Sequence, residues 1–316
     1  MPHKKTDPPP GQASFLEVSV PTAPCVPAIR EAVRQWVTSG YPGATQTTLT
    51  LLTYWFHTDH RLPDGSKFAY FPFQQEAIET LVYLYEVVKI CRHKPLLETY
   101  ARLPNLRLLQ YDLFPRYCLK MATGSGKTKV MSLAIAWQYF NSILENRQDY
   151  APTILLIAPN IIVFERLQLD FASGLVFRKD PVIPPELQIY WDFECYLRGE
   201  SERASSSGAL YLTNIQQLYE SHTEDAAPEP DIMTLMLGPK PPTQPAGVEP
   251  FFDRILKRAG PTFVVNDEAH HTHDEESEWN RSIRRLHQLL VDAGSPGILQ
   301  LDLTATPRYS KGSLFT

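Results

Sequence analysis

The segment Met121–Thr128 has the residue types and spacing of a phosphate-binding loop. It reads MATGSGKT, which matches the pattern GxxxxGK followed by Ser or Thr, except that methionine replaces the first glycine. Gly124 and Gly126 allow the backbone to curl its N–H groups around phosphate oxygens. Lys127 can reach the β- and γ-phosphates, and Thr128 can place its hydroxyl on Mg²⁺. A chance glycine-rich turn that caps a helix is the alternative. We predict that ATP contacts the last six residues, with Lys127 also serving catalysis: Thr123, Gly124, Ser125, Gly126, Lys127 and Thr128.

An acidic pair, Asp267 and Glu268, follows the apolar run Phe263–Val265. Ligands of doubly wound parallel sheets bind outside the carboxyl ends of the strands, and the pair stands at such an end. We expect Asp267 to hold Mg²⁺ through a water molecule and Glu268 to polarise the hydrolytic water. A solvated acidic turn is the alternative.

Histidines beside this pair raise the possibility of a different metal site. His270, His271 and His273 stand among carboxylates that could ligate zinc. The segment lacks the HExxH spacing, however, and no distant Cys or His motif completes a site. We therefore expect Mg²⁺ rather than zinc.

Short apolar runs alternate with helical patterns from residue 117 onward. The patterns at Lys127–Asn141 and Ile161–Phe171 predict helices. Strands that are apolar throughout are typical of a parallel sheet covered on both faces. We therefore predict an α/β fold, with a parallel sheet and helices on both faces, whose strands are 117–121, 153–158, 188–191, 209–212, 262–265 and 298–303.

The sequence divides into regions of different composition. Residues 1–13 are polar and rich in proline, which is typical of a disordered tail. The stretch 14–70 reads as a helical N-terminal extension, and 71–316 as the ATP-binding domain, opening with a long helix over Phe73–Ile90. Within that domain, 222–250 is rich in proline and has no clear period, so we expect a flexible surface insertion.

Composition excludes several classes of protein. The formal net charge is −5 and the pI is near 6.0, so the chain has no overall basic field for nucleic acid. The four cysteines are far apart and form no CxxC pair, which favours a reducing compartment. No run of 18 apolar residues and no secretory signal pattern is present. We expect a cytoplasmic protein that does not cross a membrane.

Three strings in this order resemble a known superfamily. MATGSGKT, NDEAHH and LTATPR are similar to motifs I, II and III of superfamily-two helicases and translocases, and the DEAH string is intact at 267–270. The sequences of residues 158–171, 212–219 and 304–315 further resemble the helicase (Res) subunit of type III restriction enzymes. The resemblance implies a RecA-like lobe that uses ATP and Mg²⁺ to translocate on or unwind nucleic acid. It also implies double-stranded DNA as substrate in a restriction or defence system, with a methyltransferase or another defence-system subunit as partner.

The resemblance assigns further roles to single residues. Gln74, or the adjacent Gln75, matches the glutamine that reads the adenine edge, and an amide can make two hydrogen bonds there. Motif residues expected to couple the nucleotide to the nucleic acid are His270, Thr304 and Thr306. Residues expected to hold the nucleic-acid backbone, or alternatively to act as plain helix caps, are Pro159, Asn160, Thr213, Asn214 and Gln216.

The second lobe that such motors use is not expected in this sequence. Superfamily-two motors bind ATP between two RecA-like lobes, and the second supplies an arginine finger. No QxxGRxxR run occurs up to Thr316, so we expect the N-terminal lobe only. Since an arginine finger contributes roughly 10³–10⁵ in rate, this chain alone should bind ATP weakly and hardly hydrolyse it. The alternative hypothesis is a phosphate-loop ATPase that acts on proteins or small molecules.

Overall fold

The computed structural model describes residues 25–62, 64–101, 113–197, 206–214, 251–267 and 278–305. The expected tail at 1–13 and the insertion at 222–250 lie outside these ranges.

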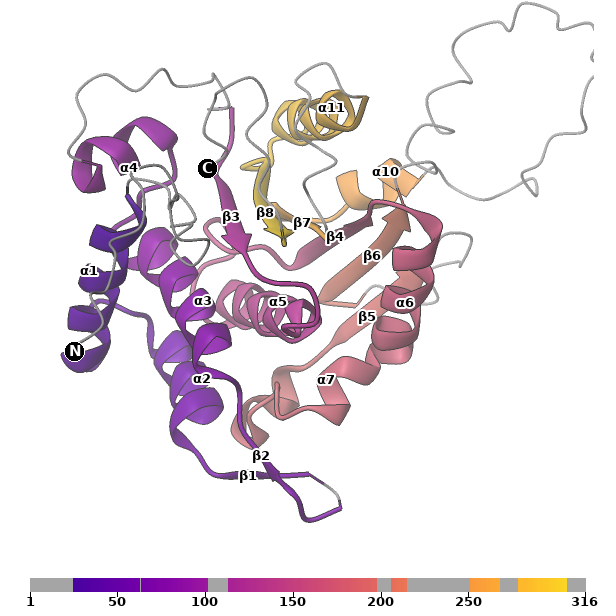
Figure 1. Ribbon diagram of the computed structural model, residues 1–316. Helices are drawn as coiled ribbons and strands as arrows, with labels where there is room; N and C mark the ends of the chain where they lie inside the picture. The colour runs from indigo at the N-terminus through magenta and orange to yellow at the C-terminus, as the bar shows by residue number, and fades with distance from the viewer. Residues whose placement is uncertain are drawn as a thin grey trace, which may run out of the picture.

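Six parallel strands form the central sheet, in the order β3-β8-β7-β4-β6-β5 (Figure 1). Every neighbouring pair is parallel. The strand after which the phosphate loop begins, β3, is therefore at one edge, and β8 separates it from β7. The predicted fold class is confirmed. The strands are β3 (Arg116–Lys120), β4 (Thr153–Ala158), β5 (Phe193–Leu197), β6 (Gly208–Asn214), β7 (Thr262–Asn266) and β8 (Ile298–Thr304).

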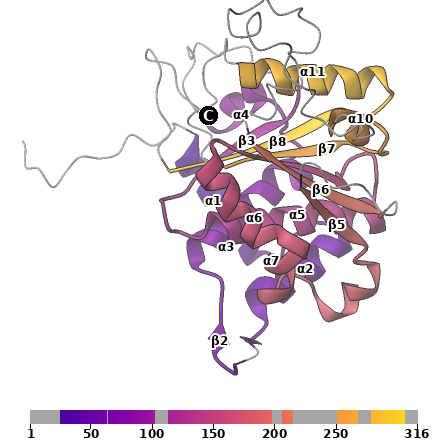
Figure 2. The ribbon, with the colours of Figure 1, turned by 90° about the vertical axis from the view of Figure 1, so that its right-hand side faces the viewer.

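Helices cover both faces of this sheet, as Figure 2 shows edge-on. One face packs against α5 (Lys127–Leu144), α6 (Ile161–Phe171) and α7 (Leu175–Lys179). The other packs against α10 (Phe251–Leu256) and α11 (Glu278–Asp292). Alternate residues of each strand enter one core or the other, which explains why the strands are apolar in sequence.

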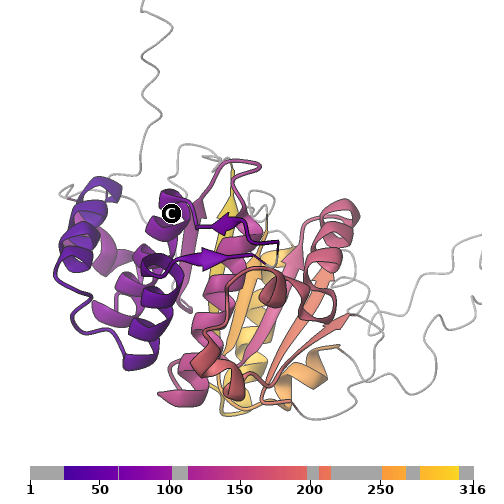
Figure 3. The ribbon, with the colours of Figure 1, turned by 90° about the horizontal axis from the view of Figure 1, so that it is seen from below.

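The N-terminal helices gather beside α5 on one flank of the sheet (Figure 3). Because α5 is enclosed between them and the sheet, nearly all of its side chains are buried. In α1 the buried residues, Ile29, Val33 and Trp36, are spaced four and three apart and therefore share one face of the helix. The elements of this part are α1 (Val26–Thr38), α2 (Gln46–His57), α3 (Pro72–Val82), the π-helix η1 (Tyr83–Val87) and α4 (His93–Tyr100).

Three expectations for local structure were wrong in part. The stretch 188–191 is not a strand: it overlaps a 3-10 helix over Pro185–Tyr190, and β5 begins two residues later. Pro185 fixes the first helical φ and favours a helical turn there. The expected single helix over Phe73–Ile90 divides into α3 and η1. The N-terminal extension is not wholly helical, because β1 (His60–Arg61) and β2 (Lys67–Phe68) form a small antiparallel hairpin.

Candidate functional site

The phosphate loop connects β3 to α5 and has the backbone shape that phosphate binding requires. Gly124 and Gly126 have φ of +76° and +78°, in the left-handed region that favours glycine. Gly126 is also the N-cap of α5, an 18-residue helix whose positive end faces the loop. Both glycines are thus needed for their conformation.

The methionine that departs from the sequence pattern has an anchoring role. Met121 is 7% exposed and packs in the core. Its N–H donates to the carbonyl oxygen of Thr304, at the end of β8, at 2.9 Å. The first position of the loop is thereby fixed to the end of β8, and the left-handed backbone of the loop is confined to Gly124 and Gly126.

The loop carries polar residues of the types that phosphate binding uses. Lys127 is buried in the first turn of α5, and Thr128 is half-buried beside it. Thr123 is exposed at the tip of the loop. Ser125 closes the loop by donating its hydroxyl to the carbonyl oxygen of Ala122 at 2.6 Å. A cation, hydroxyls and a helix N-terminus at one loop fit phosphate oxygens and a magnesium ion.

Asp267 directly follows β7, at the carboxyl end of the parallel strands, where the phosphate loop also begins. Its side chain is fully buried, and its N–H donates to the carbonyl oxygen of Ile157 in β4 at 3.2 Å. Since β7 is two strands from β3, about 10 Å separates this acid from the phosphate-loop strand. Buried Thr304 ends the strand between them. A carboxylate so placed fits a water-mediated contact to Mg²⁺.

Several predicted residues lie outside the described ranges. They are the general-base candidate Glu268, the coupling residues His270 and Thr306, and the nucleic-acid candidate Gln216. The histidine cluster near 270 is outside as well. Among the described residues, no group of three or more His, Cys, Asp or Glu could hold a metal ion.

A half-exposed arginine reaches the buried acid from another element. Arg166, on α6, donates Nη2 to Oδ2 of Asp267 at 2.7 Å. The side chain of Arg166 is 53% exposed, whereas that of Asp267 is 0% exposed. Arg166 lies within the stretch 158–171 that resembles the type III restriction subunit, but nothing in the sequence pairs it with Asp267, 101 positions away.

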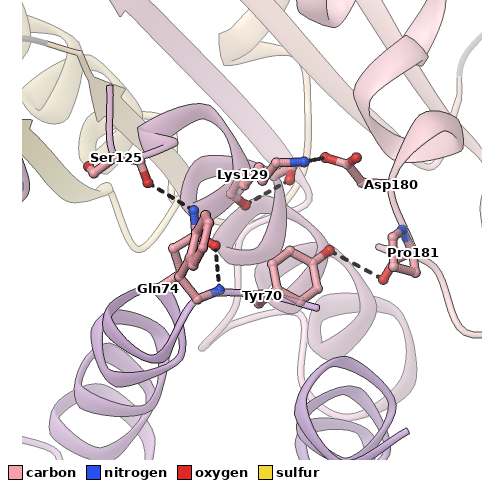
Figure 4. Close-up of polar contacts among 8 residues, drawn as sticks. Tyr70, Gln74, Ser125, Lys129, Asp180 and Pro181 are labelled. Atoms are coloured by element: carbon pink, nitrogen blue, oxygen red, sulfur yellow. Dashed lines mark hydrogen bonds and ion pairs between the residues drawn. The ribbon is translucent and has the colours of Figure 1, made fainter. Parts of the chain in front are cut away.

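Gln74 is committed to the phosphate loop in this structure. It is 1% exposed, its Oε1 accepts from the N–H of Phe71 at 3.0 Å, and its Nε2 donates to the carbonyl oxygen of Ser125 at 2.9 Å (Figure 4). The alternative, Gln75, donates to Glu79 at 2.8 Å. Adenine recognition by Gln74 stays a prediction, and its observed contacts make it a support for the loop.

Two exposed aromatic rings shortly precede Gln74 in the sequence. Phe71 and Phe73 are 59% and 45% exposed, and their rings stack with centroids 5.4 Å apart and an interplanar angle of 11°. Both rings belong to the string FPFQQ, in which only the two glutamines were predicted to bind the nucleotide. Stacked rings beside the phosphate loop add an apolar surface to the site.

The first turn of α5 also contacts residues outside the phosphate loop, through Lys129. Lys129 forms an ion pair with Asp180, which follows α7, and its Nζ lies 4.8 Å from the ring centroid of Phe68. Tyr70 donates its hydroxyl to the carbonyl oxygen of Pro181 at 3.3 Å, as Figure 4 shows. Burial, with a smaller effect of Asp180, raises the pKa of Tyr70 well above its usual value, so its hydroxyl remains a donor.

A buried polar cluster ties together the three strands that lead into the site. Asp302, fully buried in β8, accepts from Nε of Arg116 at 2.6 Å, from Asn266 at 2.6 Å and from Gln300 at 2.8 Å. Arg116 belongs to β3 and Asn266 to β7. The cluster therefore fixes the register of the strands that end in the phosphate loop, in Asp267 and in Thr304.

The expected nucleic-acid residues differ in accessibility. Asn160 is exposed, and its side chain caps α6 by accepting from the N–H of Val163 at 2.9 Å. Pro159, just before it, is half-buried. Thr213 and Asn214, at the end of β6, are only 2% and 3% exposed. A phosphate contact is thus open to Asn160, whereas the exposure of Thr213 and Asn214 does not support one.

Comparison with known proteins assigns the chain to a family. The family described as "Type III restriction enzyme, res subunit" matches residues 67–309. The chain belongs to this family. No protein of curated function matches it. Among solved structures, T4 UvsW is 11% identical with a TM-score of 0.37, over 87% of this chain and 40% of that one. The chain thus spans about 40% of the length of that solved chain.

Membership in the res-subunit family makes this a helicase-type ATPase domain. Such domains generally use ATP with Mg²⁺ and act on nucleic acid. The predicted phosphate loop, with Lys127, and Asp267 lie within the matched residues. In the described ranges, no helix is long and apolar enough to cross a membrane.

Proposed function

We propose that the chain is the N-terminal RecA-like, ATP-binding lobe of a DEAH-type helicase or translocase. Its substrate in this proposal is double-stranded DNA, within a restriction or defence system. One observation carries the proposal. The phosphate loop, with both glycines left-handed, and the buried Asp267 both follow the carboxyl ends of strands in one parallel sheet. Family membership agrees with it.

Each residue of the site has a role in this proposal. Lys127 and the N-terminus of α5 bind the β- and γ-phosphates. Thr128 and, through a water molecule, Asp267 hold Mg²⁺, which neutralises charge on the phosphates when bound. Glu268 orients and polarises the attacking water. Thr304 and Thr306, with His270, relay the nucleotide state toward the nucleic acid.

Nucleic acid would lie across the loops that follow β4 and β6. Asn160 and the N-terminus of α6 present N–H groups and a polar side chain, which suit phosphate oxygens. Pro159 and Gln216 complete this surface in the proposal, whereas the buried Thr213 and Asn214 are left out of it. Such contacts carry no sequence information and need no basic domain, in keeping with a net charge of −5.

Completion of the ATPase would require groups beyond the lobe described. In this proposal an arginine finger, supplied by a second RecA-like lobe, would stabilise the developing charge and contribute roughly 10³–10⁵ in rate. A methyltransferase or another defence-system subunit is the proposed partner class. The rival, an ATPase acting on proteins, predicts no response to nucleic acid.

Nucleotide-dependent DNA binding tests the proposal. Fluorescence anisotropy of a labelled DNA duplex would be measured against the full chain, with and without Mg²⁺ and a non-hydrolysable ATP analogue. Binding that changes with the nucleotide is expected, because the two sites are thermodynamically linked. Duplex DNA, single-stranded DNA and RNA that all fail to bind would contradict the nucleic-acid part, while leaving ATP binding intact. Tighter binding to RNA would overturn the choice of DNA.

A further inference from the structure

The ion pair between Arg166 and Asp267 joins two unequal environments. Asp267 is 0% exposed, and Arg166 is 53% exposed. A buried carboxylate is costly unless it is paired, so the hydrogen bond of 2.7 Å stabilises its charged form in place. An ordinary surface ion pair has two mobile partners and contributes little. Here only the arginine is exposed, and the buried acid that it pairs with is the one proposed to hold Mg²⁺ through a water molecule.

The strand order shows from which side the arginine approaches. Asp267 follows β7, which has β4 as one neighbour and β8, then β3, on the other side. Arg166 belongs to α6, which follows β4, whereas the phosphate loop follows β3. The carboxylate thus has the arginine on its β4 side and the phosphate loop on its β3 side. Arg166 can hold Asp267 without standing between it and the nucleotide.

We propose that Arg166 is a positioning residue that orients the Asp267 carboxylate for Mg²⁺. This inference rests on the proposed function, since it names a residue that prepares the metal ligand of that site. Partners that fix a ligating side chain raise metal affinity without touching the metal. The arginine fork suits this task because its donors have a rigid planar geometry.

The same contact links the metal ligand to the proposed nucleic-acid surface. Arg166 is in the second turn of α6, the helix that Asn160 caps. The Arg166–Asp267 contact therefore lies between the proposed nucleic-acid surface at Asn160 and the proposed metal site.

Magnesium titrations of nucleotide binding test the inference. The full chain and its variants would be titrated with a fluorescent, non-hydrolysable ATP analogue over a range of Mg²⁺ concentrations and in EDTA. Arg166→Gln should raise the Mg²⁺ concentration for half-maximal binding about tenfold, with binding in EDTA unchanged. Arg166→Lys should restore part of the loss, because it keeps the charge. Arg178→Gln is the matched control, since exposed Arg178 donates to a backbone carbonyl oxygen, that of Ser173, rather than to a buried carboxylate.

The outcomes separate this inference from the proposed function. An unchanged Mg²⁺ requirement in Arg166→Gln, beside a wild type that binds normally, overturns the positioning role alone. A lowered requirement also overturns it, because the arginine would then compete with the metal. A wild type without any Mg²⁺-dependent binding overturns both. Equal losses in EDTA and in Mg²⁺ would indicate a general structural role and likewise contradict the inference.

Discussion

At the scale of residues, Gly126 is under two constraints where Gly124 is under one. Both have φ near +77°, which costs an alanine about 1–2 kcal/mol. A Cβ on Gly126 would also lie 2.5 Å from Nε2 of Gln74, whereas one on Gly124 meets no described atom within 4 Å. Gln74 is buried, so its amide could yield only by breaking its bond to Ser125.

Gly126→Ala should therefore be more destabilising than Gly124→Ala. The difference should be about 1–3 kcal/mol, the usual effect of leaving a buried hydrogen-bonding group without its partner. Chemical denaturation of both variants measures it. The double variant Gln74→Ala with Gly126→Ala should show less than additive loss, since the clash is removed. Equal effects of the two glycine variants would contradict the supporting role of Gln74.

The sequence contains the local part of this site but not its long-range contacts. Gly124, Gly126 and Lys127 were predictable because their roles follow from neighbours in the chain. The contacts of Gln74 with Ser125 and of Arg166 with Asp267 join residues 51 and 101 positions apart. No periodicity or spacing encodes such pairs, so they required the folded structure.

At the scale of elements, the N-terminal helices are held to α5 by a buried carboxylate. Glu86, in the π-helix η1, is 6% exposed. It accepts from the N–H of Thr45 at 2.5 Å, from Oγ1 of Thr48 at 2.7 Å and from Nε1 of Trp137 at 3.1 Å. The Glu86 side chain therefore joins η1, α2 and α5, and α5 is the helix that begins at the phosphate loop.

Glu86→Ala should lower the free energy of unfolding by about 3 kcal/mol. Buried hydrogen bonds to a charged group contribute about 1.5–3 kcal/mol each, and the loss of several together is not additive. Glu98→Ala is the control, because Glu98 is 64% exposed and its ion pair with Lys94 measures 3.8 Å. The control should change stability by less than about 0.5 kcal/mol. Similar values for both variants would show that Glu86 does not fix these helices.

Most elements were predictable from hydrophobic pattern, and the exceptions have local causes. The strand 153–158 and the helix Ile161–Phe171 have the predicted bounds, since proline and apolar runs delimit them clearly. The apolar stretch at 188–191 instead completes a 3-10 helix after Pro184 and Pro185. Short apolar runs do not distinguish a strand from a helical turn, so this error could not be avoided from pattern alone.

At the scale of the whole molecule, charge limits how nucleic acid can bind. The chain has 30 basic and 35 acidic residues, so a strong overall attraction to DNA is absent from its composition. Backbone contacts at the loop before α6 would neutralise few phosphates. The salt dependence of binding reports how many are neutralised.

Duplex affinity should therefore fall gently with salt. A plot of log K against log salt concentration should have a slope no steeper than about −3, corresponding to roughly three neutralised phosphates. Anisotropy titrations between low and moderate salt give this slope. A slope near −6 or steeper would show that a basic surface, rather than N–H groups and hydroxyls, holds the DNA.

The central claim is that the phosphate loop and Asp267 bind Mg²⁺-ATP, and isothermal titration calorimetry tests it most directly. ATP would be titrated into wild type, Lys127→Ala and the control Lys120→Ala, whose lysine is exposed at the end of β3. Wild type and control should bind ATP in the presence of Mg²⁺. Lys127→Ala should lose about 100-fold or more in affinity, the expected effect of removing a buried charged partner. Equal affinity of Lys127→Ala and wild type would contradict the claim.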